Sequence, residues 1–171
     1  MESNLINVNP QMQKLADDAV STARDKFGIA LDFTENSLQK LEILLQQAHE
    51  GYEQGKSSGN WSFGTIENTV RVWGSYLGEV IRRSLGGHWI VDQKSVFLQI
   101  ESRTLDPIGQ VRSRIVEGPQ YHVQSFFQGL KSGIQNNQKE QAKYLISENS
   151  NPQFPLVEKK SKNRTTLYII G

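Results

Sequence analysis

Hydrophobic residues recur at helical spacing in the first part of the chain. In residues 9–27 they fall at every third or fourth position, which is typical of a helix that packs along one side. Asn9-Pro10 suits the start of this helix, and Gly28 suits its end. A second helix is predicted after Thr34, with an apolar stripe formed by Leu38, Leu41, Leu45, Ala48 and Tyr52.

The clearest apolar stripe runs from about Thr65 to Leu85 and predicts a third helix that ends at Gly86-Gly87. Its inward face is marked by Ile66, Val70, Trp73, Leu77, Ile81 and Leu85. Gly74 and Gly78 lie within this helix, although a glycine costs about 1 kcal/mol relative to alanine at an exposed helical position. We therefore expect another segment to pass close to the helix at these two glycines.

The pattern then changes from helical to strand-like. His88–Val91 and Ser95–Ile100 are rich in β-forming residues, and the short polar stretch between them predicts a hairpin. Asp106-Pro107 suits the start of a short helix that Gly118-Pro119 ends, and the apolar residues of 121–130 predict a further helix. These elements predict an α+β fold in which helices pack on one side of a small antiparallel sheet.

The chain is expected to form a single α+β domain over residues 1–150. Asn, Gln, Lys and Glu dominate residues 135–152, which we interpret as either a helical extension or a linker. Residues 151–171 are interpreted as a C-terminal arm or terminal hairpin that packs on the same domain, because β-forming residues flank Lys159–Asn163. The alternative is an arm that adds one strand to the sheet edge of a partner.

Glycine and serine dominate residues 55–64, which predicts a loop between the second and third helices. Trp61 and Phe63 are two aromatic residues within it. They serve either as an anchor that holds the loop on the domain or as a contact surface. Trp61 and Phe63 are therefore our candidate partner-contact residues.

The 171 residues include no cysteine, and 19 basic residues are balanced by 18 acidic ones. The absence of cysteine excludes disulfides, thiolate metal sites and cysteine nucleophiles, and it is compatible with a reducing cytoplasm. No apolar run has the length of a secretory leader or a membrane span, so we expect a cytoplasmic protein without membrane association. The balanced charge predicts no nucleic-acid partner.

Six of the eight arginines lie between Ile66 and Gly118, where acidic residues are interleaved with them. Glu79 lies near the buried side of the third helix, and an arginine nearby is the expected partner for such a carboxylate. We interpret Glu79 as part of a structural ion pair. The alternative is a ligand-binding site formed by Glu79, Arg82, Arg83, His88, Arg112 and Arg114.

No nucleotide-binding loop, nucleophile motif or zinc motif occurs in the chain. The three histidines are far apart in sequence and on different predicted elements. The sequence therefore predicts no catalytic residue, no metal site and no cofactor.

A series of short motifs runs through the central part of the chain: Gly74-x-x-x-Gly78-Glu79, Leu85-Gly86-Gly87-His88-Trp89, Asp106-Pro107 and Arg114-Ile115-x-Glu117-Gly118. This order resembles that of an uncharacterised bacterial domain family. The pattern of that family is a Gly-x-x-x-Gly-Glu helix, a Leu-Gly-x-x-Trp strand entry, a pair of strands and a helix led by proline. The resemblance implies a fold, and it implies no activity or catalytic residue.

We therefore expect a non-enzymatic bacterial cytoplasmic protein that binds another macromolecule, either a protein partner or a second copy of itself. The contact is expected at Trp61 and Phe63, at the arginine-bearing face or at the C-terminal strand. The alternative is a small-ligand-binding protein or an enzyme, with a pocket near Glu79 and the arginine cluster.

Overall fold

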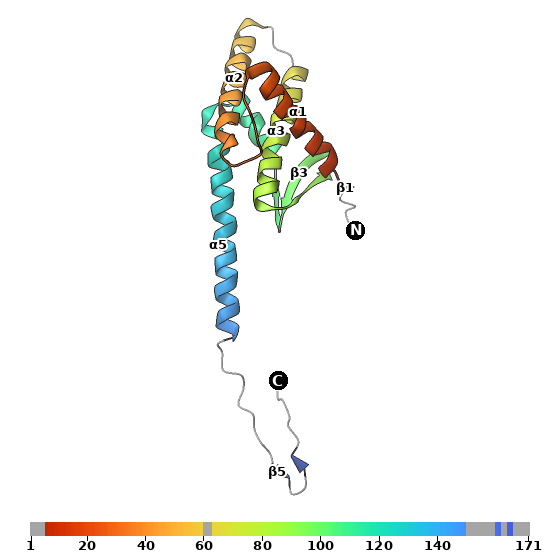
Figure 1. The fold of residues 1–171 in the computed structure, drawn as a ribbon, viewed down its shortest axis with the longest axis vertical. Helices are drawn as coiled ribbons and strands as arrows, with labels where there is room; N and C mark the ends of the chain where they lie inside the picture. Colours follow the sequence, from red (N-terminus) through yellow and green to blue (C-terminus); the bar gives the residue numbers. More distant parts are fainter. Residues whose placement is uncertain (1–5, 60–62, 150–159, 162–163, 166–171) are drawn as a thin grey trace. The chain divides into compact units, whose positions relative to one another are not determined.

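The computed structural model describes residues 6–59, 63–149, 160–161 and 164–165. The chain divides into two compact units, residues 1–131 and 132–171. The described part of the first unit contains a small antiparallel sheet and helices, which confirms the predicted α+β class (Figure 1). The α-helices are α1 (Asn9–Phe27), α2 (Ser37–Ser58), α3 (Phe63–Leu85), α4 (Pro107–Val116) and α5 (Val123–Asn149), of which α5 continues into the second unit.

The sheet contains the predicted hairpin and two further short strands. Its strands, in spatial order, are β1 (Ile6–Asn7), β2 (His88–Asp92), β3 (Ser95–Ile100) and β4 (Arg103–Leu105). The register of the hairpin pairs Trp89 with Leu98 and Ile90 with Phe97, so the two pairs lie on opposite faces of the sheet. Trp89 and Leu98 are fully buried, and they form the face of the sheet that belongs to the core.

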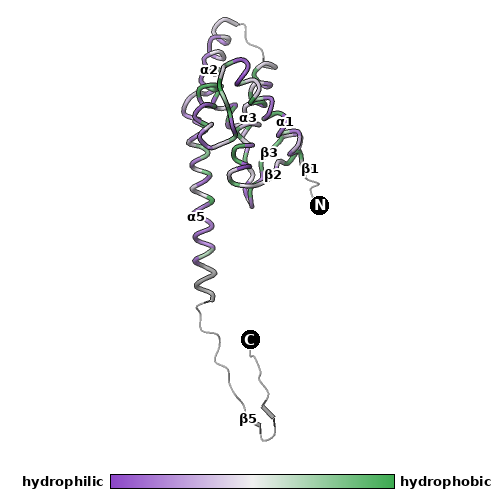
Figure 2. The backbone as a smooth tube through the Cα atoms, viewed as in Figure 1, coloured by the Kyte–Doolittle hydropathy of each residue, from purple (hydrophilic) through white to green (hydrophobic). Residues whose placement is uncertain are grey.

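The two glycines of α3 mark close contacts with other segments, as the sequence predicts. A Cβ atom at Gly74 would lie 2.7 Å from the Cα atom of Ile108 in α4. A Cβ atom at Gly78 would overlap the indole ring of Trp89. Helix α3 therefore packs against both α4 and the sheet because neither glycine carries a side chain. Figure 2 shows hydrophobic segments of α3 and of the sheet next to one another.

Helix α2 begins later than the prediction, at Ser37 rather than directly after Thr34. The N–H and the hydroxyl of Thr34 both donate to Asp32 Oδ1, at 3.0 Å and 2.7 Å. These bonds hold Thr34 in a local turn, where it does not cap the helix.

The loop predicted over residues 55–64 is shorter in the structure. Helix α2 continues to Ser58 and ends where Gly59 adopts a left-handed conformation. Helix α3 begins at Phe63. Trp61 and the side chain of Phe63 lie outside the described residues, so their role as partner contacts stays a prediction.

In the second unit, the polar segment that allowed either a helix or a linker is helical as far as Asn149. This unit also contains a hairpin in which β5 (Lys160–Ser161) pairs antiparallel with β6 (Arg164–Thr165). The expected strand residues 156–157 and 166–170 lie outside the described residues. The domain boundary predicted at residue 150 stays a prediction.

Candidate functional site

Glu79 of α3 is the centre of a hydrogen-bonded cluster, which we call the Glu79 cluster: Glu79, Arg82 and Arg83 of α3 and Trp89 of β2. The Glu79 side chain is fully buried. Its carboxylate accepts from Arg82 Nε at 2.8 Å, from Arg82 Nη2 at 3.0 Å and from Arg83 Nε at 3.4 Å. The Trp89 indole N–H donates to it at 2.9 Å. The helical spacing places both arginines over the carboxylate, as the structural interpretation of Glu79 expects.

Burial by itself raises the pKa of the Glu79 carboxyl, because the charged form loses its hydration. The hydrogen bonds from Arg82 and Trp89 and the charges of Arg82 and Arg83 outweigh burial, and the pKa lies below its ordinary value of 4.5. Glu79 is therefore ionised at neutral pH. Such a carboxylate is poorly suited to general acid catalysis, which needs a pKa near the working pH.

Arg83 is also held by an aromatic stack. Its guanidinium carbon lies 3.6 Å from the ring centroid of Phe33, and the Phe33 ring stacks on Tyr76 at a centroid distance of 4.9 Å. The Phe33 backbone has φ of 59°, and its N–H donates to the Tyr76 hydroxyl at 3.0 Å. Arg83 is thus fixed between a carboxylate and an aromatic ring.

Arg112 and Arg114 lie on α4 and pair with two other carboxylates. Arg112 donates through Nη1 and Nη2 to Glu67 of α3, and these bonds hold the pKa of the Glu67 carboxyl below its ordinary value. Arg114 is buried, and it donates from Nε to Glu42 at 3.0 Å and from Nη2 to Gln46 at 2.9 Å. None of the three partner residues, Glu67, Glu42 and Gln46, belongs to the predicted ligand-binding set. A signal for Glu42 was its place among the leucines of the α2 stripe.

The six residues predicted as a ligand-binding set therefore belong to separate places in the structure. Glu79, with its two arginines, is at the end of α3 near the sheet, whereas Arg112 and Arg114 pair with different acids. His88 is exposed at the start of β2. Arg112 also lines a surface groove of about 440 Å³, together with its partner Glu67. The ligand-binding role of the six residues stays a prediction.

The variant Glu79→Gln is expected to destabilise the protein by about 2 kcal/mol at pH 7. The amide keeps an acceptor for the Trp89 N–H but loses the charge that Arg82 and Arg83 pair with. Removing one partner of a fully buried pair costs about 3–5 kcal/mol. We expect less here because the arginine side chains are 26% and 35% exposed and stay hydrated. Urea unfolding of both proteins measures the difference.

The same experiment has a pH dependence and a matched control. Since the folded-state pKa of Glu79 is depressed, its stabilisation is complete above the ordinary pKa and is lost as the pH falls through the folded pKa. The difference between wild type and Glu79→Gln should therefore shrink at acidic pH, below about 4.5. Glu53→Gln, which alters an exposed pair with Lys56 at the same spacing, should change little. Equal stability of wild type and Glu79→Gln would contradict the structural role.

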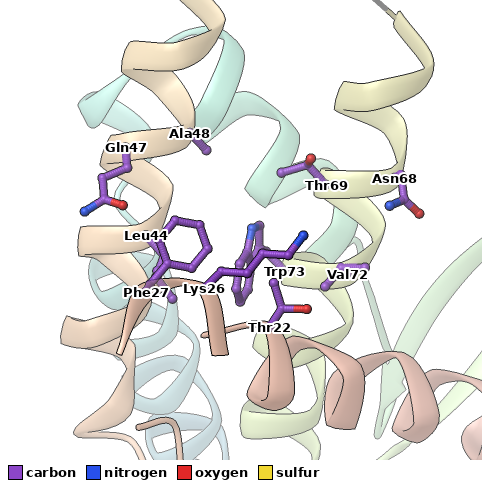
Figure 3. A pocket seen from close by; sticks show the side chains of 10 residues that line it. All are labelled: Thr22, Lys26, Phe27, Leu44, Gln47, Ala48, Asn68, Thr69, Val72 and Trp73. Atoms are coloured by element: carbon purple, nitrogen blue, oxygen red, sulfur yellow. The ribbon is translucent and has the colours of Figure 1, made fainter. Parts of the chain in front are cut away.

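A groove of about 340 Å³ lies between α2 and α3, beside the end of α1, and we call it the α2–α3 groove (Figure 3). Trp73 of α3 is 5% exposed, whereas Phe27 of α1 is 44% exposed. The two rings meet edge to face, with centroids 6.4 Å apart and an interplanar angle of 63°. The other apolar side chains of the lining are Leu44, Ala48 and Val72.

The polar part of the groove lining has one charged member. Lys26 is the ionisable residue among the described side chains that line the groove. The other polar side chains of the lining are neutral: Thr22, Gln47, Asn68 and Thr69. Phe27, Ala48 and Trp73 fall in the apolar stripes of three different helices, so their spacing in the sequence did not reveal the groove. No signal in the sequence shows that these three stripes leave a space where they meet.

Metal and membrane sites are not indicated in the described part of the chain. No cluster of three or more His, Asp or Glu side chains there is arranged to hold a metal ion. None of the described helices combines the length and the apolar character that a membrane span requires.

Comparison with known proteins adds one distant structural match. No family model and no curated protein matches this chain, so the resemblance to an uncharacterised bacterial domain family stays a prediction. A crystal structure at 1.50 Å resolution from Bacteroides thetaiotaomicron VPI-5482 matches with 18% sequence identity and a TM-score of 0.48. The match covers 74% of this chain and 46% of that protein, so this chain spans less than half of its length.

Proposed function

We propose that this protein is a non-enzymatic bacterial cytoplasmic module that binds another protein, and that the partner inserts an apolar side chain into the α2–α3 groove. The observation that carries this proposal is the pair formed by Phe27 and Trp73. One ring is largely buried, and the other presents much of its surface to solvent beside an open space.

The composition of the groove suits a protein contact. Protein interfaces concentrate their binding free energy in a few aromatic and apolar groups that are surrounded by a polar rim. The α2–α3 groove has an apolar lining around Trp73 and Phe27, and neutral polar side chains accompany it. Its volume of about 340 Å³ accommodates a large side chain of a partner.

The arrangement of the buried and half-buried carboxylates supports a function without catalysis. The carboxylates of Glu79, Glu67 and Glu42 all accept hydrogen bonds from arginines. Catalytic acids and bases need a proton that is free to move to or from a substrate. Because these three carboxylates are paired inside the protein, we assign them a role in stabilising the fold that forms the groove.

Native mass spectrometry of the tagged protein, purified gently from its own host, tests this proposal. The variant Ala48→Phe fills the α2–α3 groove, and we expect it to lose a stoichiometric partner protein that the wild type retains. Gln39→Phe is the matched control, because it adds the same ring at an exposed position of α2 outside the groove lining. This control should retain the partner.

Two results would contradict the proposal. A partner that binds Ala48→Phe and wild type equally well does not use the groove. A small molecule retained by the wild type, with no partner protein, would instead assign the chain to the small-ligand-binding proteins. Circular dichroism of each variant checks that the fold is intact.

A further inference from the structure

We infer that the α2–α3 groove selects a partner segment in which a carboxylate lies next to the inserted apolar side chain, and that Lys26 receives this carboxylate. The inference rests on the proposed function and adds the charge of the partner. It concerns Lys26 in the last turn of α1, a position that suits a cation and that also places the side chain at the groove.

Lys26 has the position that such recognition needs. Its side chain is exposed and lines the groove together with the rings of Phe27 and Trp73. In Figure 3 the side chain extends from the end of α1 toward Trp73. A ligand that occupies the groove beside the exposed edge of Trp73 would therefore lie near this ammonium group.

The charge of Lys26 is not balanced inside the groove. The described lining contains no carboxylate, and no described acid lies within ion-pair distance of Lys26. Asp25, its neighbour in the sequence, pairs with Arg24 at 2.7 Å. A bound apolar segment without charge would leave the ammonium partly covered and unpaired, which costs free energy. A cationic segment would be repelled, whereas a carboxylate would pair with it.

The favoured ligand therefore has two chemical parts. An aromatic or branched aliphatic group contacts Trp73 and Phe27, and an acidic group lies within reach of the Lys26 ammonium. In a protein partner this combination is an acidic residue beside a large apolar residue on an exposed segment. Lys26 is exposed, so its ion pair with the ligand stays partly hydrated and contributes mainly selectivity. The apolar group of the ligand supplies most of the affinity.

Binding of two small probes tests the inference directly. The probes are 4-phenylbutyrate and 4-phenylbutyramide, which share the apolar body and differ in the carboxylate. We would follow the indole N–H signal of Trp73 in ¹H–¹⁵N NMR spectra of the full chain, assigned with Trp73→Phe. At low salt we expect the acid to bind about fivefold more tightly than the amide, the preference of a partly exposed ion pair.

Variants decide whether Lys26 causes the preference. Lys26→Met keeps the apolar stem and should reduce the preference to about one, while the amide binds as before. Lys14→Met removes a cation from α1 outside the groove lining and should keep the preference. Phe27→Ala should weaken both probes by the same factor, because it removes only the apolar wall.

The possible outcomes separate the inference from the proposed function. Equal affinity for the two probes, or a preference that survives in Lys26→Met, would overturn the inference and leave the docking groove in place. Absence of any Trp73 shift with either probe would overturn both. A preference for the acid that depends on Lys26 supports the inference, whether or not a partner protein is retained in the purification.

Discussion

Gly78→Ala is expected to destabilise the protein by about 3 kcal/mol, although alanine is the better helix former. The new methyl group would overlap the indole ring of Trp89, which is fully buried. The ring cannot move away freely because its N–H donates to Glu79 at 2.9 Å. The substitution therefore forces either α3 away from β2 or the indole away from its hydrogen bond. Urea unfolding followed by far-ultraviolet circular dichroism measures the loss.

Gly51→Ala is the matched control for this experiment. Gly51 is also inside a helix, but a Cβ atom there would meet no atom within 4 Å beyond its chain neighbours and the backbone of its own helix. We expect this variant to be more stable than wild type, by about 0.5–1 kcal/mol, because alanine loses less conformational entropy in a helix. Opposite signs for the two alanines would show that packing against the indole sets the cost. A loss below about 1 kcal/mol in Gly78→Ala would contradict the packing described for β2.

Arg114→Met is the second variant with a large expected effect, a loss of about 3 kcal/mol or more. Arg114 is 3% exposed and its partner Glu42 is 8% exposed, so solvent cannot replace the lost guanidinium. Glu42 would keep the backbone N–H of Val123 and the nearby His122 ring, whose Nδ1 is 3.3 Å away. A buried carboxylate with so few partners raises the free energy of the folded state. Thermal and urea unfolding measure the change.

Two further variants show that the buried charge causes this loss. Arg24→Met makes the same substitution in an exposed pair with Asp25, and we expect no measurable change in stability. The double variant Arg114→Met with Glu42→Gln should regain part of the stability, because the uncompensated charge is removed. If the single and double variants were equally unstable, the loss would come from packing of the arginine stem and not from the charge of Glu42.

Much of the secondary structure could be predicted from the sequence because its signals are local. The stripe of α1 and its end at Gly28, the end of α3 before the paired glycines, and the β2–β3 hairpin all depend on neighbouring residues. The close contacts of Gly74 and Gly78 were also predicted, since a glycine inside a helix needs a compensating reason. Strands β1 and β4 were missed because they contain two and three residues, too few for an alternating pattern.

Some ion pairs could likewise be predicted from the sequence, whereas others depend on long-range packing. Arg82 and Arg83 follow Glu79 by three and four residues, so helical geometry alone brings them together. Arg112 and Arg114 instead pair with acids that lie 45 and 72 residues away. Several carboxylates were available to them in the sequence, and only the packing of α4 against α2 and α3 selects Glu67 and Glu42.

The sequence by itself determined the helices, the hairpin, the glycine contacts and the charge balance, because these follow from residue spacing and from side chains a few positions apart. Only the tertiary structure decided that the helices leave an open groove between α2 and α3. The groove lining includes Phe27, Ala48 and Trp73, which belong to three different helices. The apolar pattern of each helix predicts that its residue is part of the core. Whether such residues fill a core or line a groove depends on the separation between α2 and α3, which is set by long-range packing and not by the pattern of any single helix.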